Sequence, residues 1–224
     1  MSNQLGVSGD SRTLFFVICR SRTGSNLLID CLHQHPDIRV WGEIFKNQKI
    51  TTQKLISTWK KSREKVLGCK LFYYHSKNGA GDVWTFLDQN PSVKFIHLTR
   101  KDRVRTVISQ AIATHTKVWK QKWPLSLPLF FKKISIDRNW LATELEKTEN
   151  WEREFRNRYK DRSILEICYE DLVADPEKSL DNCFDFLGLK HVNIQIRLHQ
   201  QNPEKIETLV KNWAEIEPLC RRKQ

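Results

Sequence analysis

LFFVICRSRTGSNLLIDCL, residues 14–32, is the stretch that decides the fold. Its first six residues form an unbroken apolar run rich in Phe, Val and Ile, which is typical of a strand buried on both faces of a parallel sheet. A polar loop with a single glycine, Gly24, follows. Beyond that glycine the apolar residues recur at the spacing of one helix face, until His35 and Pro36 end the pattern. The stretch therefore predicts a strand, a tight loop and a helix.

The loop of this unit is suited to an anion, because it brings backbone N–H groups and a helix N-terminus to one point. Arg20 and Arg22 add two positive charges there. The loop is not a Walker A loop, which needs GxxxxGK followed by Ser or Thr, since Gly24 has neither an earlier glycine nor a following lysine. An ordinary turn, whose arginines face water, is the alternative that the loop alone leaves open.

A second strand–helix unit lies at residues 93–119. The apolar run 93–99 predicts another strand of the sheet, and Asp102 is a good N-cap for a helix whose apolar residues recur at i, i+3, i+4 and i+7. Arg100 therefore follows the carboxyl end of a strand, where ligands bind in open α/β sheets. Ser109 is expected on the polar side of the helix.

The remaining pattern alternates in the same way. Further strands are predicted at residues 66–74 and 163–169, and helices at 51–63, 82–89, 137–159 and 176–187, with a short one near 206–213. This alternation indicates an α/β fold of P-loop type, a parallel sheet flanked by helices in a single domain at residues 14–224. Residues 1–13 are expected to be a flexible leader, and residues 120–136 either a lid over the site or an ordinary crossover loop.

Composition limits the classes of partner. The 224 residues carry a net charge of +12, which favours nucleotides, nucleic acid, sulfated or phosphorylated substrates, or an anionic membrane surface. Seven Lys or Arg and one acidic residue fall within residues 100–123. Because neither a signal peptide nor an apolar run of ~20 residues is visible, we expect a cytoplasmic protein without a transmembrane segment. The six cysteines show no metal-ligand spacing and are expected to be buried thiols.

Four stretches together resemble the PAPS-dependent sulfotransferases, which use 3′-phosphoadenosine 5′-phosphosulfate. They are RTGSNLL, HPDIRVWGEIF, LTRKDRVRTVIS and YEDLVADPEKSLDNCFDFLGL, within residues 14–190. The resemblance is greatest to the bacterial branch that contains trehalose 2-sulfotransferase and the nodulation-factor sulfotransferases. The chain departs from the family at Ser21, where proline is usual, at Asn26, where Ser or Thr is usual, and at Lys117, where glycine is common.

The resemblance implies that PAPS donates a sulfuryl group to a hydroxyl of a carbohydrate or glycolipid, without a metal. It implies that Arg100 and Ser109 hold the 3′-phosphate, while the first loop cradles the 5′-phosphosulfate. The residues expected in that loop are Arg20, Ser21, Arg22, Thr23, Gly24, Ser25 and Asn26. Trp119 and Tyr169 are candidates for contact with the adenine, although core packing is the favoured role for both.

Sulfuryl transfer passes in line between two oxygens, so catalysis rests on positioning and on stabilising charge. Arg22 is predicted to be catalytic by meeting the charge that grows on the leaving phosphate. The acceptor hydroxyl needs a base, and the resemblance implies Glu43. A surface glutamate, or one that pairs with Arg39, is the alternative for Glu43, and His75 is the second candidate for the base.

Two other functions compete with this hypothesis. A P-loop nucleotide kinase would share the strand–loop–helix unit, but it would need the missing lysine. A non-catalytic nucleic-acid-binding protein would use the basic residues 100–122 as its footprint. We expect no nucleic acid partner, and we leave open an association with an anionic membrane surface and the oligomeric state, a homodimer included.

Overall fold

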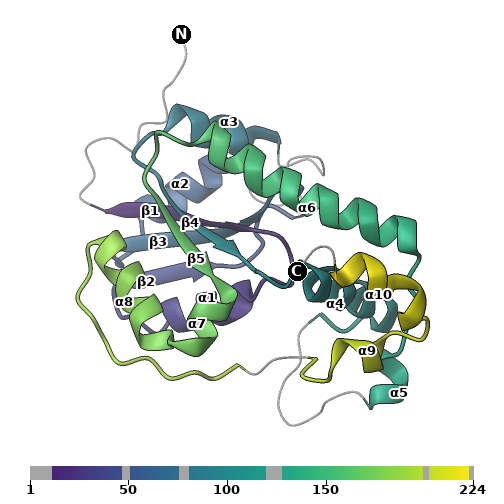
Figure 1. Cartoon of the computed structure of the whole chain (residues 1–224). Coiled ribbons are helices and arrows are strands. Elements are labelled where there is room, and N and C mark those ends of the chain that lie inside the picture. The colour runs from purple at the N-terminus through teal and green to yellow at the C-terminus, as the bar shows by residue number, and fades with distance from the viewer. Residues whose placement is uncertain (1–11, 47–50, 76–80, 120–127, 199–201, 222–224) are drawn as a thin grey trace.

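The computed structural model describes residues 12–46, 51–75, 81–119, 128–198 and 202–221. In these residues five strands form one sheet in the order β2-β3-β1-β4-β5 (Figure 1). All four neighbouring pairs are parallel. The strands are β1 (Thr13–Cys19), β2 (Ile38–Trp41), β3 (Val66–Phe72), β4 (Lys94–Thr99) and β5 (Ile164–Cys168). The predicted α/β class with a parallel sheet is confirmed.

Helices cover both faces of the sheet. One apolar cluster joins the sheet to α2, α3 and the second half of α6, another joins it to α1, α7 and α8, and a third, beside the sheet, joins α4, α6, α9 and α10. The bounds are α1 (Ser25–Leu32), α2 (Thr52–Lys60), α3 (Gly81–Gln89), α4 (Arg103–Thr116), α5 (Leu129–Lys132), α6 (Arg138–Arg158), α7 (Tyr169–Ala174), α8 (Pro176–Leu187), α9 (Ile206–Leu209) and α10 (Trp213–Arg221).

The central strand β1 explains why its sequence is an unbroken apolar run. Phe16 and Ile18 belong to the cluster under α2 and α3, whereas Phe15 and Val17 belong to the cluster under α1 and α8. Successive side chains of a strand point to opposite faces, so both faces of β1 need apolar residues. This burial fixes the loop after Cys19 at the carboxyl edge of the sheet.

The sequence-based prediction missed β2, α5, α7 and α10. β2, at the sheet edge, pairs only with β3 in the described sheet, and its alternating pattern with exposed Arg39 is too short to predict a strand. β5 ends at Cys168, and α7 begins at Tyr169, where a strand residue was predicted. The helix predicted near 206–213 is the short α9, and the separate helix α10, which carries Pro218, was not predicted.

The proposed lid is only partly described. Residues 120–127 lie outside the described residues, as do residues 1–11 of the predicted leader. The rest of the lid segment is anchored: Ile134 forms a bridge with Val210, and the buried Lys132 pairs with Glu204 at 2.8 Å. Five of the six cysteines are buried, with Cys168 partly exposed. No helix among the described residues is long and apolar enough to cross a membrane.

The contact between β1 and β3 can be tested at Gly68. It lies opposite Phe15 in the register, and an added Cβ would stand 2.3 Å from Phe15 Cζ. We expect Gly68→Ala to lower the free energy of unfolding by about 1–3 kcal/mol, because the core must shift to accept the methyl group. Urea unfolding measures this, with Gly42→Ala as the matched control, since nothing lies within 4 Å of its added Cβ. Equal effects of the two variants would contradict this packing.

Candidate functional site

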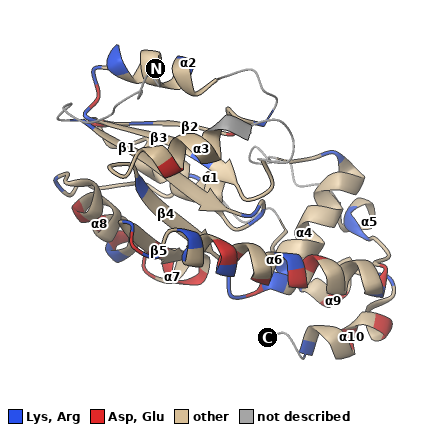
Figure 2. Cartoon of the chain, turned by 90° about the horizontal axis from the view of Figure 1, so that it is seen from above, with Lys and Arg blue, Asp and Glu red and all other residues tan. Residues whose placement is uncertain are grey.

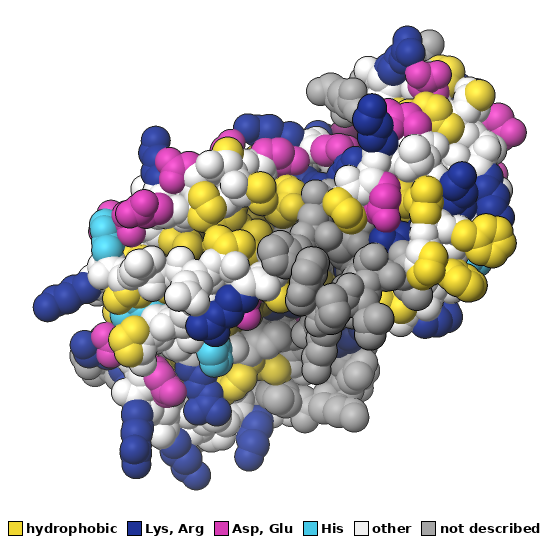
Figure 3. All heavy atoms as spheres, turned by 90° about the horizontal axis from the view of Figure 1, so that it is seen from below, with side chains coloured by type: hydrophobic (Ala, Val, Ile, Leu, Met, Phe, Trp, Pro, Cys, Tyr) yellow, Lys and Arg dark blue, Asp and Glu magenta, His cyan; other side chains and the backbone are white. Residues whose placement is uncertain are grey.

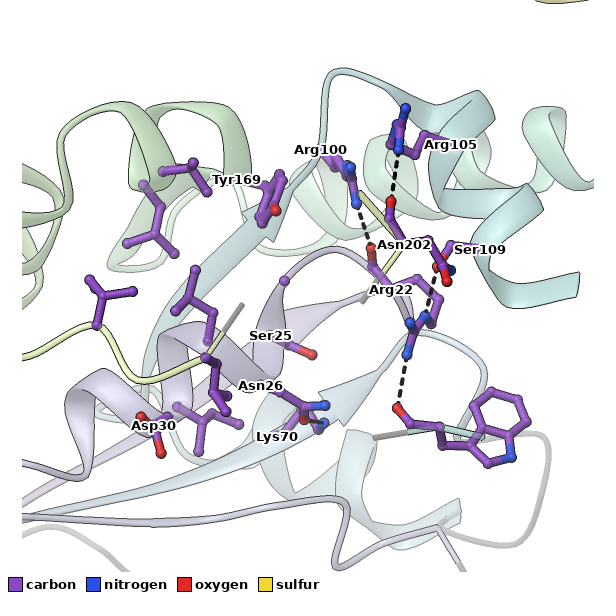
Figure 4. Close-up of a pocket in the computed structure, with 18 of the residues that line it drawn as sticks. Arg22, Ser25, Asn26, Asp30, Lys70, Arg100, Arg105, Ser109, Tyr169 and Asn202 are labelled. Atoms are coloured by element: carbon purple, nitrogen blue, oxygen red, sulfur yellow. Dashed lines mark hydrogen bonds between the residues drawn. The ribbon is translucent and has the colours of Figure 1, made fainter. Parts of the chain in front are cut away.

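A cavity of about 1020 Å³ opens at the carboxyl ends of β1, β3 and β4 (Figure 4). Its walls come from the loop before α1, from α1 itself, from α4, from the start of α7, and from residues 196–198 and 202–209. Segments far apart in the sequence thus meet at the edge where open parallel sheets bind ligands.

The loop between β1 and α1 makes two left-handed turns. Arg22 has φ 70° and Gly24 has φ 89°. Gly24 caps α1 without a side-chain hydrogen bond, and no acidic residue lies in the first turn of the helix. A Cβ on Gly24 would stand 2.2 Å from Tyr169 Cδ2, so close packing as well as conformation requires glycine here. The loop therefore presents a helix N-terminus to the cavity, which favours an anion.

Arg22 of this loop and Arg100, which follows β4, bring two cations to this side of the cavity. Arg22 Nε donates to Ser109 Oγ at 3.0 Å, and its Nη1 donates to the Trp119 carbonyl at 2.9 Å. Arg100 Nη1 donates to the Arg22 carbonyl at 3.2 Å. Burial lowers the pKa of the Arg22 guanidinium, and the nearby charge of Arg100 lowers it further. A bound anion would offset both costs.

The other side of Arg100 is covered by an aromatic ring. Its guanidinium lies 4.3 Å from the Tyr169 ring centroid, while its Nε is buried without a hydrogen-bond partner among the described residues. Tyr169 therefore packs against Gly24 and Arg100 rather than in the core. Trp119 is 43% exposed and lines the cavity. Core packing, the favoured role for both rings, is wrong.

The C-terminal segment closes the cavity near Ser109. Asn202 Nδ2 donates to Ser109 Oγ at 3.4 Å, and Arg105 Nη1 donates to the Asn202 carbonyl at 3.0 Å. Sequence analysis did not find Asn202, because no motif marks this segment and its contacts lie about 90 residues away in the chain. Arg105 lies in the second strand–helix unit, but no role was predicted for it.

Three of the predicted loop residues turn their side chains away from the cavity. Arg20 is 1% exposed, and its guanidinium pairs with Glu144 on α6 at 2.7 Å and bonds Thr148. Ser21 Oγ donates to Gln110 on α4 at 3.1 Å. Thr23 donates back to the Arg20 carbonyl. These side chains fasten the loop to the helices behind it, which leaves Arg22 and the end of the loop to face the cavity.

Lys70 is a second residue that sequence analysis missed. Its ammonium is 3% exposed and lies 3.0 Å from Glu43 Oε1 and 2.9 Å from Asn26 Oδ1. The signal was present, because Lys70 is the one charged residue in the apolar run 66–74. Asn26 thus positions a cation beside the N-terminus of α1.

Glu43, the predicted base, faces the cavity and is partly exposed. Burial alone would raise its pKa, but the charge and hydrogen bond of Lys70 more than offset this, with Lys46 and His75 adding to the effect, so the pKa lies below its usual value. The alternative pairing with Arg39 is wrong, since Arg39 lies over Trp41 instead. In the absence of a ligand, Glu43 is a carboxylate held by cations.

His75 is poorly placed as a base. It is buried, and its Nδ1 accepts a hydrogen bond from the Phe72 amide at 3.3 Å. Burial lowers the pKa of His75 to about 4, so the neutral ring carries its proton on Nε2. The lone pair that a base would use is therefore occupied by the backbone.

Of the three departures from the family pattern, the structure gives Lys117 a physical reason. It caps α4 in the left-handed region with φ 58°, where glycine has the least strain. Lys117 therefore takes a backbone conformation that glycine adopts with less strain.

The fold and the cavity define an α/β protein with an anion-binding loop at its sheet edge. Residues 85–193 match the model of the family described as the sulfotransferase family. A comparison with curated proteins gave no match.

Solved structures support the fold. A sulfotransferase from Alicyclobacillus acidocaldarius is 15% identical with a TM-score of 0.59, over 95% of this chain and 92% of that one. The sulfotransferase domain of the curacin biosynthetic pathway is 13% identical with a TM-score of 0.54, over 88% and 82%. Mouse sulfotransferase SULT7A1, complexed with PAP, is 13% identical with a TM-score of 0.50, over 96% and 64%. At such identities the likeness concerns the fold.

The buried, neutral state of His75 predicts a pH dependence. Its folded pKa of about 4 lies below the ordinary 6.5, so between these values the unfolded chain binds the extra proton. The stability that His75 preserves at neutral pH should fall by up to about 3 kcal/mol as the pH drops from 6.5 toward 4. Urea unfolding across this range, with His75→Gln for comparison, measures the change.

The difference between wild type and His75→Gln should shrink on acidification. His191→Gln serves as the control, because His191 is exposed and Asp185 raises its pKa, so its contribution is lost on going to higher pH rather than lower. A constant difference between wild type and His75→Gln would show that His75 is not held neutral.

Proposed function

We propose that this protein transfers the sulfuryl group of PAPS to a hydroxyl of a carbohydrate or glycolipid acceptor. The observation that carries the proposal is the cluster of Arg22, Arg100 and Ser109 beside the N-terminus of α1. It supplies two neighbouring places for an anion, one at the helix N-terminus and one at Arg100. A nucleotide with phosphate groups on both its 5′ and 3′ positions fits this pair.

The 5′ end of the donor would lie against the loop. Amides of Thr23, Gly24 and Ser25, with Arg22, are placed to stabilise charge on the leaving phosphate, and Lys70 stands where it can reach the transferring group. The 3′-phosphate would engage Arg100 and Ser109. That the mouse relative was solved with PAP supports PAPS as the donor.

A nucleotide kinase fits these residues less well. The lysine that reaches the loop, Lys70, comes from β3 rather than following the loop glycine, and the site offers a second anion position that a nucleoside triphosphate does not need. These features favour a donor that carries phosphate groups on both its 5′ and 3′ positions.

Nucleic-acid binding is also disfavoured by the placement of the basic residues. Arg103 pairs with Glu152 on α6 at 2.8 Å, and Arg105 is engaged by the C-terminal segment. Acidic and basic residues alternate along α6 (Figure 2). On the face seen in Figure 3, Lys and Arg are spread among Asp and Glu. The basic run therefore does not form an open footprint.

We further propose that the acceptor reaches the side of the cavity where Glu43 lies, and that Glu43 removes its proton. Donor binding would bring negative charge to Lys70 and weaken its hold on the Glu43 carboxylate. The exposed aromatic pair on α5, with Phe130 81% and Phe131 58% exposed, is followed in the chain by the exposed Lys133 and Arg138. This combination suits the surface of an anionic membrane and supports a glycolipid acceptor.

The donor assignment is tested by thermal shift with PAP and AMP. PAP carries the 3′-phosphate that Arg100 and Ser109 should hold, so it should raise the melting temperature far more than AMP at equal concentration. A ligand at 100 times its dissociation constant stabilises by about 2.7 kcal/mol. Arg100→Gln should reduce the shift with PAP toward that with AMP and leave the AMP shift unchanged. Equal shifts for both nucleotides in the wild type would refute the assignment.

The role of Glu43 is tested by Glu43→Gln, which keeps the size and removes the ability to take a proton. We expect turnover to fall on the order of 10²- to 10⁴-fold. PAP affinity should stay the same or rise, since a negative charge near the phosphosulfate is removed. Sulfate transfer from labelled PAPS to free sugars and to glycolipids in anionic vesicles, with calorimetry of PAP binding, measures both.

Glu146→Gln on the exposed side of α6 is the matched control and should leave both quantities unchanged. A Glu43→Gln protein that keeps more than about a third of its turnover would exclude this base. Loss of PAP binding would show that Glu43 shapes the loop instead.

A further inference from the structure

Trp119 is a large aromatic side chain in the cavity whose ring the donor site does not use. It lines the cavity and is 43% exposed. Its backbone, rather than its ring, contacts the loop before α1, because its carbonyl accepts the hydrogen bond from Arg22 Nη1. An indole left open in a cavity presents a flat apolar surface to a ligand.

The ring of Trp119 lies near Glu43, and one side chain connects the two. Lys46 Nζ lies 5.6 Å from the centre of the indole ring and 3.8 Å from Glu43 Oε2. Gly42, which precedes Glu43, also lines the cavity, and a Cβ added to it would meet nothing within 4 Å. Open space therefore lies beside the carboxylate that is proposed to take the acceptor proton, close to the indole.

Polar groups surround Glu43 on its other side and restrict what the ligand can be. Lys70 lies 3.0 Å from Glu43 Oε1 and 2.9 Å from Asn26 Oδ1, and all three residues line the cavity. A ligand here meets one flat apolar surface and a set of charged and hydrogen-bonding groups. A pyranose ring has this double character, since its C–H groups form apolar faces and its hydroxyls project from the rim. A phenol or a steroid would cover the polar groups and take away their water without replacing it, which is costly.

We infer that Trp119 is the stacking surface for a pyranose ring of the acceptor and makes the protein specific for pyranosides over open-chain polyols; this inference rests on the proposed function. The C–H face of the sugar packs on the indole, which removes apolar surface of both from water. Stacking also fixes the plane of the ring, so that the hydroxyl to be sulfated is oriented toward Glu43. An open-chain polyol carries the same hydroxyls but no rigid apolar face, and it loses both the contact and the orientation.

Sulfate transfer from labelled PAPS tests the inference, with a panel of methyl pyranosides, their open-chain alditols and glycolipids as acceptors. Wild-type protein should use a pyranoside with a kcat/KM about 10-fold above that of its alditol, the worth of one aromatic contact. Trp119→Ala should raise the KM for the best acceptor about 10-fold, with a smaller effect on kcat, whereas Trp119→Phe keeps a ring and should retain most of the wild-type value. Calorimetry should show the same PAP affinity in both variants, since the carbonyl of residue 119 remains available to Arg22.

Trp140→Ala is the matched control, because Trp140 is 38% exposed on α6 and is not among the described residues that line the cavity; it should keep the wild-type KM. A Trp119→Ala protein with an unchanged acceptor KM overturns the inference. So does one that loses PAP affinity, because Trp119 would then contact the donor. Equal use of pyranosides and alditols by the wild type also overturns it, whether or not a variant folds. If the wild type binds PAP but sulfates no sugar or glycolipid, the proposed acceptor class itself fails, and the inference fails with it.

Discussion

The buried guanidinium of Arg20 is the interaction on which the site depends. A charge that is 1% exposed is stable only when paired and hydrogen-bonded, and Arg20 obtains its partners from α4 and α6. The first loop residue after β1 is thereby held in the protein interior. Arg22, two residues later, takes a left-handed turn and extends toward Ser109. The two arginines of one short loop thus have opposite placements: Arg20 is held in the interior, and Arg22 faces the cavity.

Because Arg22 faces the cavity, its positive charge lies close to that of Arg100 in the free protein, which is electrostatically unfavourable. Arg22 and Arg100 lie close together and are both largely removed from water, which lowers the pKa of each. Their fixed position costs stability in the free protein, and an anion between them would recover it. If PAPS binds as proposed, these groups are already oriented, so little reorganisation would be needed when charge develops on the leaving phosphate, which is the condition for effective electrostatic catalysis.

The sequence predicted those parts of the fold and site that are encoded locally. The buried strand β1, the loop glycine and the stripe of α4 each follow from spacing within about twenty residues, and they place Arg22, Arg100 and Ser109 together. The local sequence could not show that Arg20 is buried while Arg22 faces the cavity, because the partners that bury Arg20, Gln110 and Glu144, lie 90 and 124 residues away in the chain. Asn202 was not predicted because no sequence motif marks its segment. The edge strand β2 was not predicted because it has too few residues to show an alternating pattern. Lys70 was visible as a lone charge in an apolar strand, yet only the fold shows that it meets Asn26 and Glu43.

The pairing of Lys70 with Glu43 also implies an order of events, if PAPS binds as proposed. In the free protein Lys70 shares its charge between Asn26 and Glu43, and the Glu43 carboxylate has a pKa below its usual value, which makes it a weak base. A phosphosulfate at the N-terminus of α1 would compete for Lys70 and bring negative charge near Glu43, and both effects raise the proton affinity of that carboxylate. The base would then be strengthened by the donor itself. Donor binding before proton removal from the acceptor is therefore the sequence that this arrangement of charges favours.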